Sequence, residues 1–166
     1  IIIDDCSTDN TLEIIKYFAK IDNRIQYYQN KKNRQITYCL NKSLKYVTGD
    51  YVARMDGDDI ALPERLEKQL EFLEKRGDIG LVGTHELNID SDGNIIGRNK
   101  KITNEELLQK SQLLASPVPH PTWLARKIIF DKVGGYHTHS PAQDYDFLLR
   151  MSSLGLKFAN LDIDGN

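Results

Sequence analysis

The chain has 166 residues, of which 24 are acidic and 22 basic, so its formal net charge is -2 and no large field of one sign would attract nucleic acid. Hydrophobic residues make up 40% and charged residues 28%, which suits one compact globular unit and excludes a disordered or fibrous protein. No apolar run approaches the roughly 18 residues that a membrane-spanning helix needs, and two cysteines, Cys6 and Cys39, exclude a disulfide framework.

The first part of the sequence alternates between strand and helix patterns. It predicts a strand, a helix, a strand, a helix and a strand, at 1–3, 11–20, 24–29, 36–47 and 51–55. This alternation is typical of a parallel sheet flanked by helices. The chain begins inside an apolar run with Ile1 rather than methionine, so we expect an excised fragment.

The second part mixes hairpin and helix signals. A helix begins after Pro63 and ends at Gly77, and the remaining elements are expected at 79–82, 87–90, 94–97, 105–114, 122–125, 127–133 and 144–154. Ser91-Asp92-Gly93 is a turn between two strands of a hairpin. We therefore predict an α/β fold with a mixed, mainly parallel sheet, flanking helices and a β-hairpin.

Two of the predicted strands end in clusters of carboxylates. Asp4 and Asp5 follow the first, and Asp56, Asp58 and Asp59 follow the strand at 51–55. Ligands of open α/β sheets bind beyond the carboxyl ends of the strands, so these acids should meet at one edge. A hard divalent cation such as Mg²⁺ or Mn²⁺ would make such crowding tolerable and would leave positions for phosphate oxygens. Acidic turns are common after strands, so spacing alone leaves both interpretations open.

Five segments, in this order along the chain, resemble the motifs of family 2 glycosyltransferases. They are the Asp-Asp-x-Ser-x-Asp segment, the Asp-x-Asp loop with its following helix, and three acceptor-side or catalytic segments, at 1–11, 53–66, 120–122, 133–136 and 143–150. The resemblance covers almost the whole chain. It implies a GT-A (Rossmann-like) fold, and a single family 2-like domain over 1–166 that is truncated at both ends and lacks the family's first strand.

On the donor side, the resemblance implies a nucleotide-sugar, usually a UDP-sugar, and Mn²⁺ or Mg²⁺ as cofactor. Asp5, with Asp4, would contact the base of the nucleotide, and Asp56 would lie near the ribose or sugar. Asp58 would ligate the metal that holds the diphosphate. The cation would neutralise charge on the departing diphosphate.

On the acceptor side, Asp144 matches the general base that takes a proton from the acceptor hydroxyl. One displacement at the anomeric carbon then inverts its configuration. His120 and Gln143 are candidate acceptor-side contacts, and the loop from His139 to Gln143 should be shaped by substrate. The acceptor would be a glycan or a lipid-linked molecule in cell-surface polysaccharide synthesis by bacteria.

Three residues depart from the family pattern. Gln143 stands where the family often has Glu, and Gln35 and Cys6 stand where Gly is common. Together with the strand expected before Ile1, these departures motivate an alternative, a catalytically inert nucleotide-sugar-binding or scaffold domain.

Partners and location follow from the same resemblance. It implies a cytoplasmic protein that acts at the inner face of the cell membrane, with membrane association only through segments outside these residues, and without a nucleic-acid partner. Two other interpretations start from the carboxylates: a haloacid-dehalogenase-type phosphatase, which needs a downstream lysine and Thr or Val where Ile60 stands, and a two-component receiver, which needs a phosphorylatable aspartate.

Overall fold

The computed structural model describes residues 1–138, 140 and 142–166, and these form two compact units. The first unit comprises Ile1–Thr48 and Gly135–Gln143, and the second comprises Gly49–Gly134 and Asp144–Asn166. The single domain expected over 1–166 stays a prediction.

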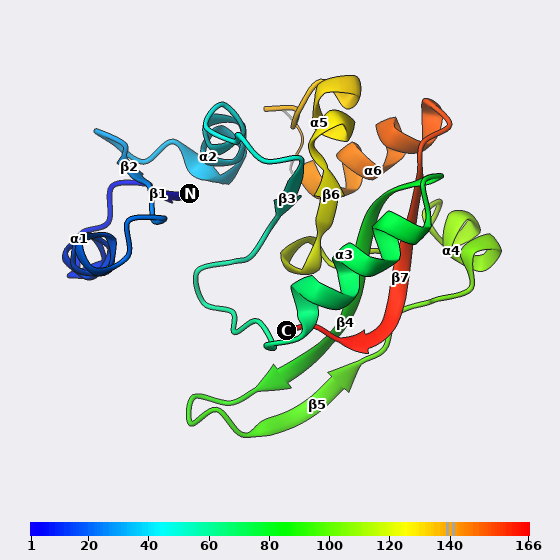
Figure 1. Ribbon diagram of the computed structural model, residues 1–166, viewed down its shortest axis with the longest axis horizontal. Coiled ribbons are helices and arrows are strands. Elements are labelled where there is room, and N and C mark those ends of the chain that lie inside the picture. The colour runs from blue at the N-terminus through cyan, green and yellow to red at the C-terminus, as the bar shows by residue number, and fades with distance from the viewer. Residues whose placement is uncertain (139, 141) are drawn as a thin grey trace. The chain divides into compact units, whose positions relative to one another are not determined.

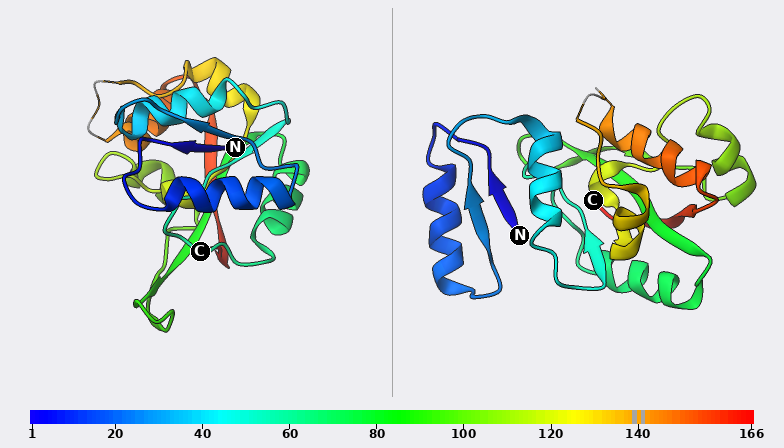
Figure 2. Two further views of the ribbon diagram at one scale, coloured as in Figure 1. Left: turned by 90° about the vertical axis from the view of Figure 1, so that its left-hand side faces the viewer. Right: turned by 90° about the horizontal axis from the view of Figure 1, so that it is seen from above.

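The first unit is a two-stranded parallel sheet with two helices. Strand β1 (Ile2–Asp4) pairs with β2 (Tyr27–Gln29), and α1 (Thr11–Ile21) lies along this pair in Figure 2. Helix α2 (Gln35–Leu44) follows β2 and ends before Gly49. The strand, helix, strand and helix are therefore present in the predicted order.

The second unit is built on a five-stranded sheet. Four of its strands lie side by side in the order β3 (Tyr51–Ala53), β6 (Leu124–Arg126), β4 (Ile79–Ile89) and β5 (Ile95–Asn99). Each of them is antiparallel to the next. The mixed α/β fold and the hairpin are as predicted. The share of antiparallel pairing is larger than the opening alternation indicates, because β6 lies between β3 and β4 and runs opposite to both.

The last strand is not among the elements predicted from the sequence. Strand β7 (Lys157–Asp164) pairs parallel with β4, with Leu81 opposite Phe158 and Gly83 opposite Asn160. It was missed because one of its three consecutive buried residues is Asn160, a polar side chain that interrupts the apolar pattern.

Helix α3 (Arg65–Lys75) packs on this sheet, beside β4 and β7 in Figure 1. Its buried face consists of Arg65, Gln69 and Leu73, spaced four residues apart as one side of a helix requires. Leu73 joins the hydrophobic cluster of Ile79, Val82, Leu124 and Ala159.

Three of the remaining described helices are short, and the fourth precedes β7. They are α4 (Glu105–Ser111), the 3₁₀ turn η1 (His120–Thr122), α5 (Lys127–Val133) and α6 (Gln143–Ser153). Within the described residues, no helix is both long enough and apolar enough to cross a bilayer.

Candidate active site

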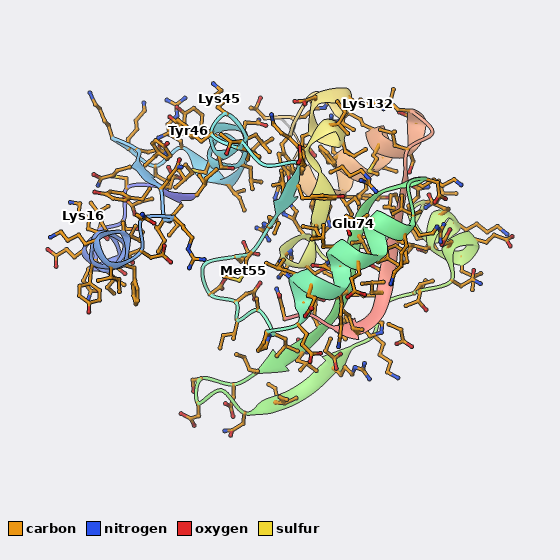
Figure 3. All side chains as sticks on the ribbon, viewed as in Figure 1. Lys16, Lys45, Tyr46, Met55, Glu74 and Lys132 are labelled. Atoms are coloured by element: carbon orange, nitrogen blue, oxygen red, sulfur yellow. The ribbon has the colours of Figure 1, made fainter. Side chains whose placement is uncertain are left out.

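The loop that follows β3 carries three carboxylates within four residues, and we call it the Asp56–Asp59 loop. Met55, which is 51% exposed, marks where the chain enters it in Figure 3. The Arg54 guanidinium donates from both terminal nitrogens to the two oxygens of Asp56, with 2.6 Å between Nη1 and Oδ2. The Arg54 side chain is only 10% exposed, so this fork holds Asp56 from the protein side.

Asp59 is held by a neutral partner. Its Oδ2 accepts a hydrogen bond from Nδ2 of Asn166 at 3.3 Å. Burial, followed by the negative charges of Asp56 and Asp58, raises the pKa of the Asp59 carboxyl above its ordinary value.

Asp58 differs from both neighbours. Its side chain is exposed, and within the described part of the chain its carboxylate has neither a hydrogen bond nor an ion pair. In this loop, Asp58 thus presents two free oxygens to solvent.

Asp144 lies in the first turn of α6 and is partly buried. Ser116 Oγ donates to its Oδ2 at 3.3 Å. The other acid of this turn, Asp146, forms an ion pair with Arg150 at 2.9 Å. Asp144 thus has a neutral hydrogen-bond donor where Asp146 has a cation.

His120 is buried in η1, 7% exposed, with its ring edge-on to Trp123 at a centroid distance of 4.5 Å. Burial, and then the positive charge of Arg54, lowers the pKa of His120 to about 3. Its imidazole is therefore neutral near pH 7, and it can contact an acceptor or a phosphate by hydrogen bonding but not by charge. Gln143 is the first residue of α6 and is partly buried.

Two residues of the loop predicted to be shaped by substrate, His139 and Pro141, lie outside the described residues. The prediction for that loop therefore stays untested.

In the first unit, Asp5 holds the start of α2. Its carboxylate accepts from the backbone N–H of Arg34 and of Gln35, both at 2.8 Å, and from Asn30 Nδ2 at 2.7 Å. Burial raises the pKa of Asp5, but these hydrogen bonds outweigh it and hold the pKa below its ordinary value. Each of the two oxygens already has donors from the protein itself.

Asp4 has more capacity left. It is 3% exposed, and its Oδ1 accepts from the backbone N–H of Ser7 at 3.2 Å. Its Oδ2 is buried without a partner among the described residues. A buried acceptor without a donor is costly, so Asp4 is the more available of the two for a ligand N–H.

Several side chains that organise these carboxylates were not singled out from the sequence. Asn30 is one: its Oδ1 accepts from Lys42 Nζ at 2.7 Å while its Nδ2 serves Asp5. The others are Arg54, Ser116 and Asn166. Of these four, only Arg54, two positions before Asp56, could have been indicated by its spacing to a carboxylate.

The described residues contain no group of three or more His, Cys, Asp or Glu side chains placed to hold a metal ion. One free carboxylate still fits Mg²⁺ or Mn²⁺, because such ions are commonly bound through one or two carboxylates, with phosphate and water oxygens completing the shell. Asp4 and Asp5 belong to the first unit and the Asp56–Asp59 loop belongs to the second, so the convergence of these acids at one edge stays a prediction.

The proteins that this chain resembles in sequence are glycosyltransferases. The profile of Glycosyl transferase family 2 matches residues 1–134. The putative glycosyltransferase EpsE of Bacillus subtilis (strain 168) is 38% identical over 97% of this chain and 58% of EpsE. The amylovoran biosynthesis glycosyltransferase AmsE of Erwinia amylovora is 34% identical over 79% of this chain and 49% of AmsE. The chain thus spans about half the length of the curated relatives it matches.

Solved structures show the same fold. S. aureus TarS 1-349 in complex with UDP-GlcNAc has a TM-score of 0.71 at 20% identity, over 99% of this chain and 47% of TarS 1-349. The mannosyltransferase PcManGT from Pyrobaculum calidifontis, in complex with GDP-Man and Mn²⁺, has a TM-score of 0.70 at 17% identity, over 99% of this chain and 46% of PcManGT. The GT-A fold predicted from the sequence is confirmed.

Proposed function

Because the chain belongs to glycosyl transferase family 2, we propose that it carries the donor-binding and catalytic side chains of an inverting glycosyltransferase. The donor is a nucleotide-sugar, most consistent with a UDP-sugar, and the acceptor is a hydroxyl of a glycan or lipid-linked molecule in cell-surface polysaccharide synthesis. The AmsE relative, described as an amylovoran biosynthesis enzyme, and the UDP-GlcNAc complex of TarS support this assignment.

One observation carries the proposal: among the described residues, Asp58 is exposed and has neither a hydrogen bond nor an ion pair, whereas Asp56 bonds Arg54 and Asp59 bonds Asn166. Asp58 is therefore the residue that would hold Mn²⁺ or Mg²⁺, and Asp56, held by Arg54, would face the ribose or sugar. A divalent cation there supplies charge neutralisation for the leaving diphosphate. The Mn²⁺ bound in PcManGT supports the choice of ion.

Asp144 is the general base of this proposal. It accepts the proton of the acceptor hydroxyl as that oxygen forms its bond to the anomeric carbon and the bond to the diphosphate breaks. Attack and departure on opposite faces invert the anomeric configuration in one step. Ser116, at 3.3 Å, would hold the carboxylate in one orientation for this transfer.

On the nucleotide side, the geometry favours Asp4 over Asp5 as the contact to the base. The Asp4 Oδ2 is buried and has no hydrogen-bond partner in the described part of the chain, so a ring N–H of a pyrimidine would satisfy it. In this proposal Asp5 does not contact the base, and it fixes the start of α2 by accepting hydrogen bonds from the backbone N–H groups of Arg34 and Gln35.

The test uses the full-length protein that contains this chain, offered a panel of nucleotide-sugars, with products identified by mass spectrometry. Asp144→Asn should lower turnover by about 10²- to 10⁴-fold while UDP still binds. Asp58→Asn should weaken the Mn²⁺-dependent part of UDP binding, measured by calorimetry with and without Mn²⁺. Asp92→Asn, in the hairpin turn, is the matched control and should change neither.

Two results would overturn parts of this proposal. Unchanged transfer by Asp144→Asn would remove the base assignment. UDP binding without transfer from any donor in the panel would favour the inert binding or scaffold domain instead.

A further inference from the structure

A single buried arginine holds the Asp56–Asp59 loop from the side of α3. Arg65, the first residue of that helix, is only 2% exposed. Its Nη2 donates to the backbone oxygen of Arg54 at 2.8 Å. Its Nη1 donates to the backbone oxygen of Pro121 at 3.1 Å and to Oδ1 of Asn166. One guanidinium thus donates hydrogen bonds to the entry of the loop, to η1 and to the segment that follows β7.

The segment after β7 closes the other side of the loop. Nδ2 of Asn166 donates to Asp59 at 3.3 Å, and the backbone N–H of Leu62 donates to the oxygen of Gly165 at 2.8 Å. Asn166 therefore links Asp59 to Arg65 through its two amide atoms. Both ends of the loop are fixed by groups that are not themselves carboxylates.

This arrangement has an electrostatic consequence. Three carboxylates in four residues repel one another, and a loop free to move would separate them. Among the described residues no carboxylate bonds directly to the Arg65 guanidinium, and its Nε has no partner. The buried positive charge of Arg65 attracts Asp59 without bonding it directly, and this attraction opposes the repulsion among the carboxylates of the loop.

We propose that Arg65 and Asn166 are positioning residues that fix the Asp56–Asp59 loop for cation binding and so set the affinity of Asp58 for the divalent cation. Neither residue touches cation or donor in this proposal, which rests on the proposed role of Asp58. The planar fork of arginine can hold two oxygens at fixed separation, whereas lysine supplies the same charge without that geometry.

The chain offers a matched control at the far end of α3. Arg126 is also partly buried, and its guanidinium likewise donates to backbone oxygens, those of Ile79 and Leu73. It also bonds the hydroxyl of Tyr51 at 3.0 Å. Arg126→Lys therefore removes a comparable set of hydrogen bonds from the same unit without touching the acidic loop.

The experiment measures Mn²⁺ binding to the full-length protein in the presence of saturating UDP, from the electron paramagnetic resonance signal of free Mn²⁺. Thermal unfolding is recorded on the same samples. Arg65→Lys and Asn166→Ala should weaken Mn²⁺ binding by about 10- to 100-fold, as loss of residues that orient a ligand does. The Mn²⁺ concentration for half-maximal transfer should rise equally, while the rate at saturating Mn²⁺ should stay near that of the wild type.

The outcomes separate the two proposals. If Arg65→Lys and Asn166→Ala bind Mn²⁺ as Arg126→Lys does, at an equal folded fraction, the positioning role is wrong even though Asp58 binds the ion. If Asp58→Asn itself leaves Mn²⁺ binding unchanged, the proposed cation site fails first. A lower unfolding temperature for all variants with a loss of Mn²⁺ affinity only for Arg65→Lys and Asn166→Ala supports the inference.

Discussion

His120 makes the stability of the second unit depend on pH in a defined window. In the folded chain its pKa is about 3, because of burial and then Arg54, whereas an unfolded histidine titrates near 6.5. Below pH 6.5 the unfolded chain therefore binds a proton that the folded chain does not. The stabilisation from the neutral imidazole is complete above pH 6.5 and is lost as the pH falls from 6.5 toward 3.

The magnitude follows from the difference in bound protons. The free energy of unfolding should fall with a slope approaching about 1.4 kcal/mol per pH unit, which gives a loss of about 2 kcal/mol between pH 7.5 and pH 5. Acids with lowered pKa values, such as Asp162, lose their contributions only at lower pH, whereas Asp59, whose pKa is raised, changes stability in the opposite direction. The contribution of His120 is therefore obtained from the difference between the wild type and a variant that lacks this histidine.

The assay is urea unfolding followed by the fluorescence of Trp123, the single tryptophan of the chain. This side chain is fully buried in the second unit and contacts the His120 ring, so its signal reports on the relevant structure. His120→Gln is the comparison, because it removes the titrating group and leaves the other histidines. If the wild type and His120→Gln lose the same free energy between pH 7.5 and pH 5, the reasoning from burial is refuted.

Four further predictions test the structure around the acids. Gly165→Ala should destabilise the second unit by about 1 to 3 kcal/mol in urea unfolding, because a Cβ there would lie 2.0 Å from Thr84 Oγ1; Gly77→Ala, which meets nothing within 4 Å, should be nearly neutral. Asp5→Ala should lower the free energy of unfolding by about 1 kcal/mol, because it removes the acceptor for the first N–H groups of α2. A thermal unfolding curve equal to that of the wild type, followed by helical circular dichroism, would contradict this. Gln35→Gly should raise the unfolding temperature slightly, because φ is 66° at this position and glycine adopts that conformation without strain; a lower temperature would show that the Gln35 side chain outweighs the strain. Removing divalent cations with EDTA should lower the unfolding temperature only slightly in calorimetry, because Arg54 and Asn166 hold the loop without metal and only the binding energy of the ion itself is lost; a large decrease would show a structural cation.

The elements of the fold were largely predictable because their signals are local. The helix after Pro63 and the hairpin around Asp92 each follow from residues within one turn of each other. Cys6 and Gln35 stand where glycine is common in the family, and both have a positive φ, 69° and 66°. The physical reason for glycine at these positions is therefore present in the backbone.

The support of the site was not predictable because it is long-range. Asp5 caps a helix that begins 30 residues later, and Arg65 meets Asn166 across 101 residues. No periodicity connects such positions, and the contact with Asn166 depends on β7, the strand that the sequence analysis missed.

The two kinds of residue follow different physical rules. A residue that receives a ligand must be polar and accessible, so Asp58 is visible in the sequence as an acid at the end of a strand. A residue that fixes its position must be buried and satisfied by backbone oxygens, as Arg65 is by those of Arg54 and Pro121. In sequence alone such an arginine on an amphipathic helix is indistinguishable from a solvated one, because its partners are carbonyl groups that every residue carries. Only the fold separates Arg65 from the exposed basic residues of α3, Lys68 and Lys75.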